Sequence, residues 1–425
     1  MILLISQQRA PVHSQNVNEM KKLWTRDFSI LSLGSVISIF GNALAGFTVN
    51  LMVLDYSESI FLFVLFMVVF NIPKLIMPML VGPLLDSFSR RKTIYLLDFT
   101  SAAIYFSLFF VLSGGYFNYI FLLIMSFIMG SIDSTYVVAY ESLYPVLVAE
   151  GNYRKAYSVS SMIMPLSTIV LPVAAYLYDR IGVGQILLYS AAAFFIAACI
   201  ETQIRADETH LRKKDEKYNF SEFKTSFKEG LNYIKGEKGL LVITSYFFVS
   251  MFAMSSHSLF LPFFREAPHL SVMMYTFVMM AGVLGRFIGG VIQYKLDLPV
   301  NWKFKIAIVV YVSYCCMEMM LLFSPIYVMA LLSFTVGLLT VTSYNIRIST
   351  TQSYIPDSKR ARYNGTFHMI MNAGLILGQL TAGALADIIP IRAVVVTFNG
   401  ICLIAIFAIM WRGRRHVIPI FNRSV

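Results

Sequence analysis

The chain has 425 residues, of which 57 % are hydrophobic and 13 % are charged, and its mean hydropathy is +0.69. So much apolar surface cannot be buried in one water-soluble core, which excludes a soluble globular protein and means that most of the chain faces lipid. The net charge is +11. The positions of the lysines and arginines indicate that these charges keep loops on the cytoplasmic side and contact anionic membrane lipids. They do not favour a nucleic-acid partner.

Apolar stretches long enough to cross the roughly 30 Å hydrocarbon layer recur along the whole chain. Lipid offers no partner for backbone polar groups, and these stretches lack the period-2 alternation of barrel strands, so they are predicted to be helices. The sequence therefore predicts an all-α membrane protein with twelve transmembrane helices, at residues 28–54, 60–84, 93–113, 116–146, 156–178, 183–201, 240–263, 270–294, 304–323, 326–353, 363–386 and 391–411.

Lysine and arginine fall overwhelmingly on one side of this topology. With the N-terminus inside, 28 of the 34 lie in inner loops and terminal segments, three lie in outer loops and three lie within spans. Because positive charge is retained on the cytoplasmic side, both termini are expected in the cytoplasm. Residues 1–27 lack the apolar core of a cleaved signal and are expected to be a cytoplasmic segment.

The four cysteines lie in apolar helices without the spacing of a metal or redox site, and no nucleotide-binding P-loop pattern occurs. No cluster of catalytic residues stands at a predicted membrane face. We therefore expect no enzyme activity, no cofactor and no metal. The cysteines, expected to be packing residues, are Cys199, Cys315, Cys316 and Cys402.

A long polar segment divides the predicted spans into two groups of six. Within it, residues 220–234 place apolar and charged side chains on opposite faces of a helix, which predicts an amphipathic helix on the inner membrane surface. The expected organisation is a segment 1–27, a six-helix bundle 28–201, a linker 202–239, a second bundle 240–411 and a cytoplasmic tail 412–425.

The two groups of spans show signs of an internal repeat. The pattern at residues 141–145, Glu-Ser-x-x-Pro, matches the pattern at residues 352–356, Gln-Ser-x-x-Pro, with an offset of 211 residues. Each is followed by a short basic loop and a span that ends in aspartate, Asp179 and Asp387. A parallel six-span repeat is typical of transporters whose substrate site lies between the halves near mid-membrane.

The loop between spans 2 and 3 carries an acid followed one turn later by three cations: Gly82, Asp86, Arg90, Arg91 and Lys92. This pattern resembles the GxLaDRxGRRk signature of the major facilitator superfamily, with serine at two of its positions. The small glycine would let helices approach closely, and Asp86 can accept hydrogen bonds from a facing helix N-terminus. These five residues are expected to form a conformational gate that closes the cytoplasmic side; alternatively, Asp86 only balances the neighbouring cations.

Further resemblance is to the superfamily branch that contains macrolide-efflux and siderophore-export proteins. It is carried by Pro145-Val-Leu-Val with Arg154-Lys-Ala156, and by residues 352–378 in the second half. The branch's glycine-flanked antiporter motif is missing around Pro172, and Asn42 stands where an acid is frequent.

This resemblance implies two six-helix bundles and a secondary active transporter that exports an amphipathic small molecule (a drug, siderophore or metabolite) by alternating access, coupled to protons. It also implies a monomer in a bacterial inner (cytoplasmic) membrane. Uptake symport and lipid flipping are the alternatives within the same fold, because a fold fixes neither cargo nor direction. A membrane enzyme or receptor is the remote alternative.

Ionisable residues inside the membrane are interpreted as functional by default, because placing a charge in the bilayer costs about 2.5 kcal/mol or more. Asp133 lies near the middle of span 4, and Tyr136, Tyr140 and Tyr144 follow on nearly the same helical face. Spans 1, 4, 7 and 10 line the central cavity in the resembled fold, so this tyrosine stripe is expected to face the substrate. Glu141 lies close to the cytoplasmic end of the same span.

The repeat offset places Arg347 of span 10 at a depth similar to that of Asp133. An acid and a base could therefore meet across the cavity, and Asp133, Glu141 and Arg347 are the candidates for proton coupling; a static buried ion pair is the alternative.

The sequence leaves three roles open for Lys74 in span 2: a counter-charge to Asp133, a snorkelling side chain or a substrate contact. Glu318 in the peripheral span 9 is expected to be structural. The candidates for the substrate cavity are Asn42, Lys74, Tyr136, Tyr140, His257, His368 and Asn372.

Overall fold

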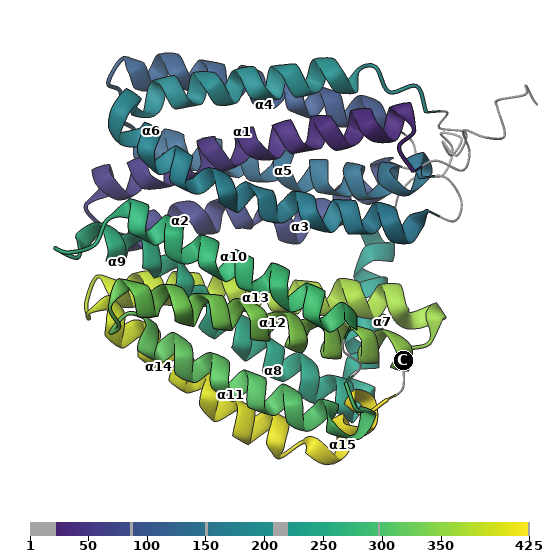
Figure 1. Cartoon of the computed structure of the whole chain (residues 1–425). Helices are drawn as coiled ribbons and strands as arrows, with labels where there is room; N and C mark the ends of the chain where they lie inside the picture. The colour runs from purple at the N-terminus through teal and green to yellow at the C-terminus, as the bar shows by residue number, and fades with distance from the viewer. Residues whose placement is uncertain (1–22, 86–87, 149–151, 207–219, 296–297, 424–425) are drawn as a thin grey trace, which may run out of the picture.

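A computed structural model describes residues 23–85, 88–148, 152–206, 220–295 and 298–423. The regular elements in these ranges are all helices, and Figure 1 shows them in two bundles that follow one another along the chain. The start of α1 and the C-terminus lie at the same end of the molecule, which we call the terminal end, and the opposite end is the distal end.

The first bundle contains six elements, one of which makes two crossings. Predicted span 2 is divided at Pro73, which lacks a backbone N–H and begins a new helix there. Predicted spans 5 and 6 are two helical segments that meet in a turn at the non-helical residue Gly182, where φ is 78°, a value that glycine adopts without steric cost. The elements are α1 (Arg26–Ser57), α2 (Ile60–Asn71), α3 (Pro73–Leu85), α4 (Arg90–Ser113), α5 (Tyr119–Leu147) and α6 (Tyr153–Glu201).

The second bundle begins after α7 (Phe220–Gly236). Its predicted first span contains a short 3₁₀ segment, and its last span ends in a π-helical turn. The elements are α8 (Lys238–Met254), η1 (Ser255–Leu259), α9 (Phe260–Glu266), α10 (Val272–Lys295), η2 (Val300–Trp302), α11 (Lys303–Leu321), α12 (Ile326–Tyr354), α13 (Asp357–Ala386), α14 (Ile391–Ala405), η3 (Ile406–Trp411) and α15 (Arg414–Phe421).

The described residues include eleven helical stretches that are long and apolar enough to cross a membrane. One of them, Ser167–Glu201, belongs to α6, which begins at Tyr153, turns back at Gly182 and so crosses twice, which gives twelve crossings in the described residues. Large apolar side chains also stand exposed on the outside of the bundles, for example Tyr327 at 86 % and Ile404 at 68 %. Exposed apolar surface on helices of this length suits contact with lipid. The predicted all-α fold with twelve transmembrane helices is confirmed.

Glycines let α10 and α12 approach closely within the second bundle. A side chain at Gly285 would collide with the carbonyl of Phe334, and one at Gly337 would collide with the carbonyl of Gly282. Small residues at such contacts let transmembrane helices pack backbone to backbone. The glycines of this stretch therefore serve helix packing.

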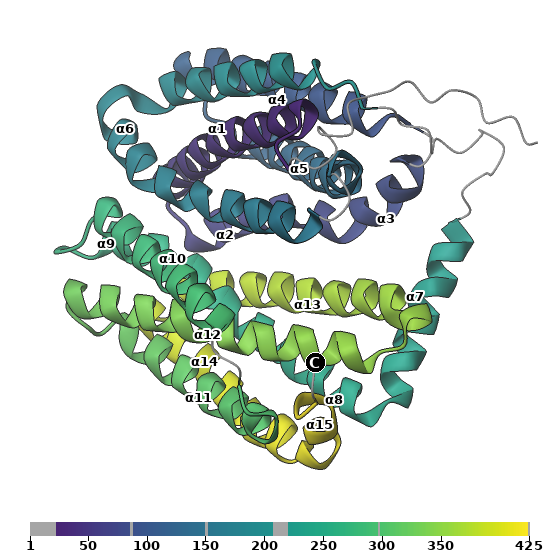
Figure 2. The same ribbon diagram turned by 45° about the vertical axis from the view of Figure 1, so that its right-hand side comes forward.

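The two bundles contact each other mainly through α2 with α13 and through α6 with α10. Figure 2 shows the bundles closest at the distal end and farther apart at the terminal end, where α7 lies. In the described residues, the halves are thus joined mainly toward the distal end in this state.

The linker helix and the tail both pack onto the second bundle. Ile234 of α7 is buried, Gly230 lies directly against Thr366 of α13, and Glu229 pairs with Arg362 at 2.7 Å. The helix predicted at 220–234 is therefore present, and part of it docks on protein. The tail was expected to be a simple cytoplasmic segment; it forms α15, whose apolar face is buried against α8 and α12.

Candidate functional site

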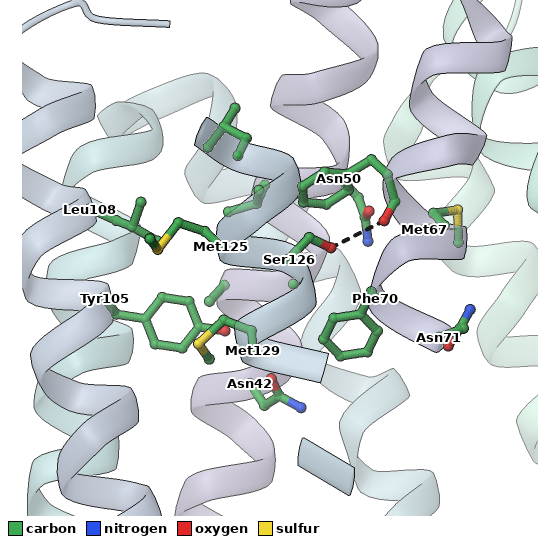
Figure 3. A pocket seen from close by; sticks show the side chains of 15 residues that line it. Asn42, Asn50, Met67, Phe70, Asn71, Tyr105, Leu108, Met125, Ser126 and Met129 are labelled. Carbon is green, nitrogen blue, oxygen red and sulfur yellow. Dashed lines mark hydrogen bonds between the residues drawn. The ribbon is translucent and has the colours of Figure 1, made fainter. Parts of the chain in front are cut away.

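A cavity of about 300 Å³ lies inside the first bundle, between α1, α2, α4 and α5 (Figure 3). Its walls are mostly apolar, with methionines and aromatic rings contributed by three of the four helices. Polar groups are few, and they include the amides of Asn42, Asn50 and Asn71. Figure 3 shows Tyr105 and Leu108 on one side of the cavity and Phe70 and Met67 on the other.

These side chains suit a small amphipathic ligand. Methionine side chains are flexible and polarisable, so Met67, Met125 and Met129 can adapt to ligands of different shape. The volume falls at the lower end of the range of small-molecule sites, about 300–1,000 Å³. Asn71 also reaches the second bundle, because its amide lies 3.5 Å from that of Gln379. The cavity therefore touches the interface between the halves.

An ion pair stands next to this cavity. The ammonium of Lys74 lies 3.3 Å from Asp133 Oδ2, and the amide of Asn42, which also lines the cavity, lies 3.3 Å from Asp133 Oδ1. The Lys74 ammonium also stands 4.7 Å above the ring of Phe70. Of the alternatives for Lys74, this geometry matches a counter-charge to Asp133. The side chains remain 40 % and 27 % exposed, so solvent can reach the pair.

Asp133 and Arg347 do not meet in this structure, so that part of the prediction is wrong for this state. The guanidinium of Arg347 stands over the rings of Phe247, Tyr344 and Phe367 at 4.9, 5.4 and 5.1 Å, all within the second bundle. No carboxylate of the described residues forms an ion pair with it. The repeat offset predicts depth along a helix, but it does not predict the direction in which a side chain points.

The tyrosine stripe of α5 is real, but it turns into the first bundle rather than toward the other half. Its rings follow one another, at 6.3 Å from Tyr136 to Tyr140 and 5.2 Å from Tyr140 to Tyr144. Tyr144 is fully buried, and Tyr136 contacts Ser35 Oγ at 3.2 Å. Helical spacing identifies a face without telling whether that face meets a cavity or a core.

The remaining coupling and cavity candidates lie apart from the ion pair. Glu141 is exposed, two turns beyond Asp133 toward the terminal end. His257 contacts the buried Glu318 at 3.1 Å and Tyr314 at 3.2 Å, which makes it part of a polar cluster inside the second bundle.

His368 and Asn372 share one face of α13 with Gln379, which reaches α2. His368 is exposed and Asn372 is half-buried. This face of α13 is therefore directed toward the first bundle.

The predicted gate is only partly within the described residues. Gly82 lies in α3, and Asp86 falls outside the described ranges. Arg90 donates to the backbone carbonyl of Ser142 at 3.0 Å, and Arg91 donates to that of Ile204 at 3.1 Å. The two arginines thus bind carbonyls near the terminal ends of α5 and α6, while Lys92 is exposed. The gating role remains a prediction.

The distal end carries inter-bundle contacts that we call the distal latch. Asp387, after α13, accepts from Ser59 Oγ at 2.8 Å and from the backbone N–H groups of Ile60 and Phe61 at 2.9 and 3.3 Å. A carboxylate at a helix N-terminus is favourable because it satisfies free N–H groups and the helix dipole. Arg265 pairs with Asp55 through two bonds of 2.9 Å. The latch thus joins α2 to the end of α13, and α1 to α9.

A family model described as Major Facilitator Superfamily matches residues 31–353. This chain belongs to the major facilitator superfamily. A relative from Bacillus subtilis (strain 168), an uncharacterized MFS-type transporter YkuC, is 24 % identical over 290 residues. That alignment covers 64 % of this chain and 66 % of the relative, so it spans slightly less than two thirds of the relative's length.

Solved structures of superfamily transporters have the same fold. The nucleoside transporter NupG matches with a TM-score of 0.70 at 14 % identity, over 91 % of this chain and 99 % of that one. An inward-facing bacterial homolog of the lysosomal transporter Spinster matches with a TM-score of 0.67 at 13 % identity, over 94 % and 98 %. At these identities the likeness concerns the fold alone.

Sequence reasoning missed several polar residues of this superfamily member. Asp55 and Asp387 stand at span ends, where acids are common, and their joint position became visible only when the bundles were placed together. Asp98 and Glu201 lie in apolar runs, so the rule for intramembrane acids applies to them as it does to Asp133. Asn50 was missed because a single amide in a span is a weak signal.

Proposed function

We propose that this protein is a proton-coupled secondary transporter that exports an amphipathic small molecule. The observation that supports this most is the cavity beside the Lys74–Asp133 ion pair, with Asn42 contributing to both. A ligand in the cavity and a proton on Asp133 would act on connected groups. Coupling requires such a link, because the affinities for the ligand and for the proton must both differ between the conformational states.

The contacts between the bundles support alternating access. The distal latch is closed, while the bundles lie farther apart at the terminal end. With both termini in the cytoplasm, this arrangement is an inward-facing state. Rocking of the bundles would break the latch, and the residues from Gly82 to Lys92 would then close the cytoplasmic side.

The orientation is tested by labelling single cysteines in intact cells, in a variant that lacks the four native ones. Ser89→Cys lies at the terminal end and should resist a membrane-impermeant thiol reagent. Tyr116→Cys, at the distal end and 75 % exposed in the native chain, is the matched control and should label readily. The reverse pattern would overturn the orientation and, with it, the direction of the proposed transport.

Transport itself is tested with purified protein in liposomes under an imposed pH difference. A panel of dyes, antibiotics, siderophores and nucleosides is offered on each side in turn. We expect uphill movement of at least one solute out of the compartment that the terminal end faces, coupled to proton movement the other way. Co-movement of solute and protons would favour uptake symport, and movement of labelled phospholipid would favour lipid flipping. Failure of every solute to move uphill would contradict proton-coupled transport.

A further inference from the structure

Two acids are buried side by side in the first bundle, apart from the Lys74–Asp133 pair. Asp98 of α4 is 2 % exposed, and Glu201 at the end of α6 is 0 % exposed. Asp98 lies eight residues into α4, so it stands about 12 Å inside the terminal end at about 1.5 Å per residue. The pair is thus located between the terminal end and Asp133.

The structure around the acids is closely fitted. Ser38 donates to Asp98 Oδ2, and Tyr136 donates to Glu201 Oε1 at 3.3 Å. The Glu201 carboxyl packs against α1 at Gly34, where a Cβ atom would come within 2.6 Å of it. Glycine at this position therefore makes room for the acid.

One acceptor in the pair lacks a donor among the described residues. Glu201 Oε2 is fully buried and receives no hydrogen bond from this part of the chain, while the carboxyl of Asp98 lies beside it. Two ionised carboxylates offer only acceptors, but a protonated carboxyl is also a donor. A single proton on the pair would satisfy this orphan oxygen.

Within the described part of the chain, no cation pairs with the two acids. The groups that face them are hydroxyls, from Ser35 and Ser38 of α1 and from Tyr136 and Tyr140 of α5. Within the described ranges no lysine, arginine or histidine forms an ion pair with either acid. Two adjacent carboxylates in a medium of low dielectric cannot both stay ionised without such compensation.

A small pocket lies between Asp98 of this pair and Asp133 of the ion pair described above. It has a volume of about 50 Å³, and its lining includes Asp98, Ser101, Asn42 and Asp133. The walls are partly apolar, but these polar side chains and this volume are enough for ordered water, which needs roughly 10–15 Å³ and two or more polar partners. Water in the pocket would link the two carboxyl sites by hydrogen bonds.

We propose that Asp98 and Glu201 form a proton-binding site that holds one shared proton and exchanges it with Asp133 through the pocket. The proton leaves a carboxyl O–H, passes along water and forms a new O–H on Asp133, and the pair is refilled from solution at the terminal end. A neutral Asp133 no longer attracts the ammonium of Lys74. The role of this step in transport rests on the proposed function, but the presence of the bound proton does not.

Infrared spectroscopy of the purified full-length protein tests the site without any substrate. Protonated carboxylic acids give a carbonyl stretch that carboxylates lack. We expect a band at neutral pH that disappears in alkaline buffer. It should be lost in the double variant Asp98→Asn, Glu201→Gln, and each single substitution should remove or shift it. Glu229→Gln, which changes an acid that is 48 % exposed and paired with Arg362, is the control and should leave the band unchanged.

The single substitutions keep the test valid if the double variant fails to fold. A band that neither Asp98→Asn nor Glu201→Gln alters would overturn the site. The band could respond as expected in a protein that shows no proton-driven transport. That result would support the proton-binding site and contradict the proposed coupling, so the two claims can fail separately.

Discussion

Asp133→Asn is expected to abolish uphill, proton-driven transport while sparing downhill exchange of substrate. The neutral amide mimics protonated Asp133, so the variant should lose the charge change without losing the cavity. Lys74 would lose its ion-pair partner, but it is 40 % exposed and keeps its contact with the ring of Phe70. For so exposed a pair we expect a stability change of about 1 kcal/mol or less. Exchange and uphill uptake in proteoliposomes measure the two activities.

The charge swap Lys74→Asp with Asp133→Lys separates coupling from a purely structural pair. A structural pair tolerates reversal, so recovery of full proton-driven transport would rule out Asp133 as the coupling group. Glu229→Gln removes an acid from a surface ion pair and should leave both activities unchanged. Proton coupling that survives Asp133→Asn would shift attention to Glu141.

Asp387→Ala should open the distal end of the transporter. The substitution removes three hydrogen bonds to the N-terminus of α2 and its neighbour Ser59. Ser59 remains the N-cap, but the N–H groups of Ile60 and Phe61 lose their side-chain acceptor. Loss of such an acceptor at a helix N-terminus costs about 1 kcal/mol, and that difference shifts the ratio of two states roughly fivefold. In the variant without native cysteines, a cysteine at Asn71 should therefore react about fivefold faster with an impermeant reagent applied to intact cells.

Asp179→Ala provides the matched control for the latch. Asp179 ends the span that matches the one ended by Asp387; it is exposed, and it forms no hydrogen bond or ion pair with another described residue. Its removal should leave the labelling rate of the Asn71→Cys protein unchanged. An unchanged or slower rate in Asp387→Ala would contradict the latch.

Hydropathy was sufficient to predict the helices because a membrane span must bury a continuous apolar length. The span expected at 326–353 is Ile326–Tyr354, and that expected at 93–113 is Arg90–Ser113. The break at Gly182 also agrees with the expected spans, because 156–178 and 183–201 lie on either side of it. The same signal does not show that Pro73 divides the span expected at 60–84 into two helices.

Positions in the site were harder to predict than helices. The charge of Asp133 identifies it as a candidate, and the sequence offers two partners for it: Arg347 from the repeat and Lys74 as one of three alternatives. The structure pairs it with Lys74. Single-sequence patterns give depth and face along one helix, and ion pairs depend on how separate helices are rotated. The same limit explains why the tyrosine stripe was expected at the cavity. It also explains why the neighbouring positions of Asp98 and Glu201 became visible only in three dimensions.

Paired distance measurements test most directly the claim that the two bundles rock with one end open at a time. Spin labels at Tyr56 and Ile388 report the distal end, and labels at Trp24 and Lys359 report the terminal end; all four positions are exposed. In the native background we expect a short distal and a long terminal distance. Asp387→Ala should lengthen the distal distance and shorten the terminal one together. Distances that change at one end only, or in the same direction at both ends, would contradict the account.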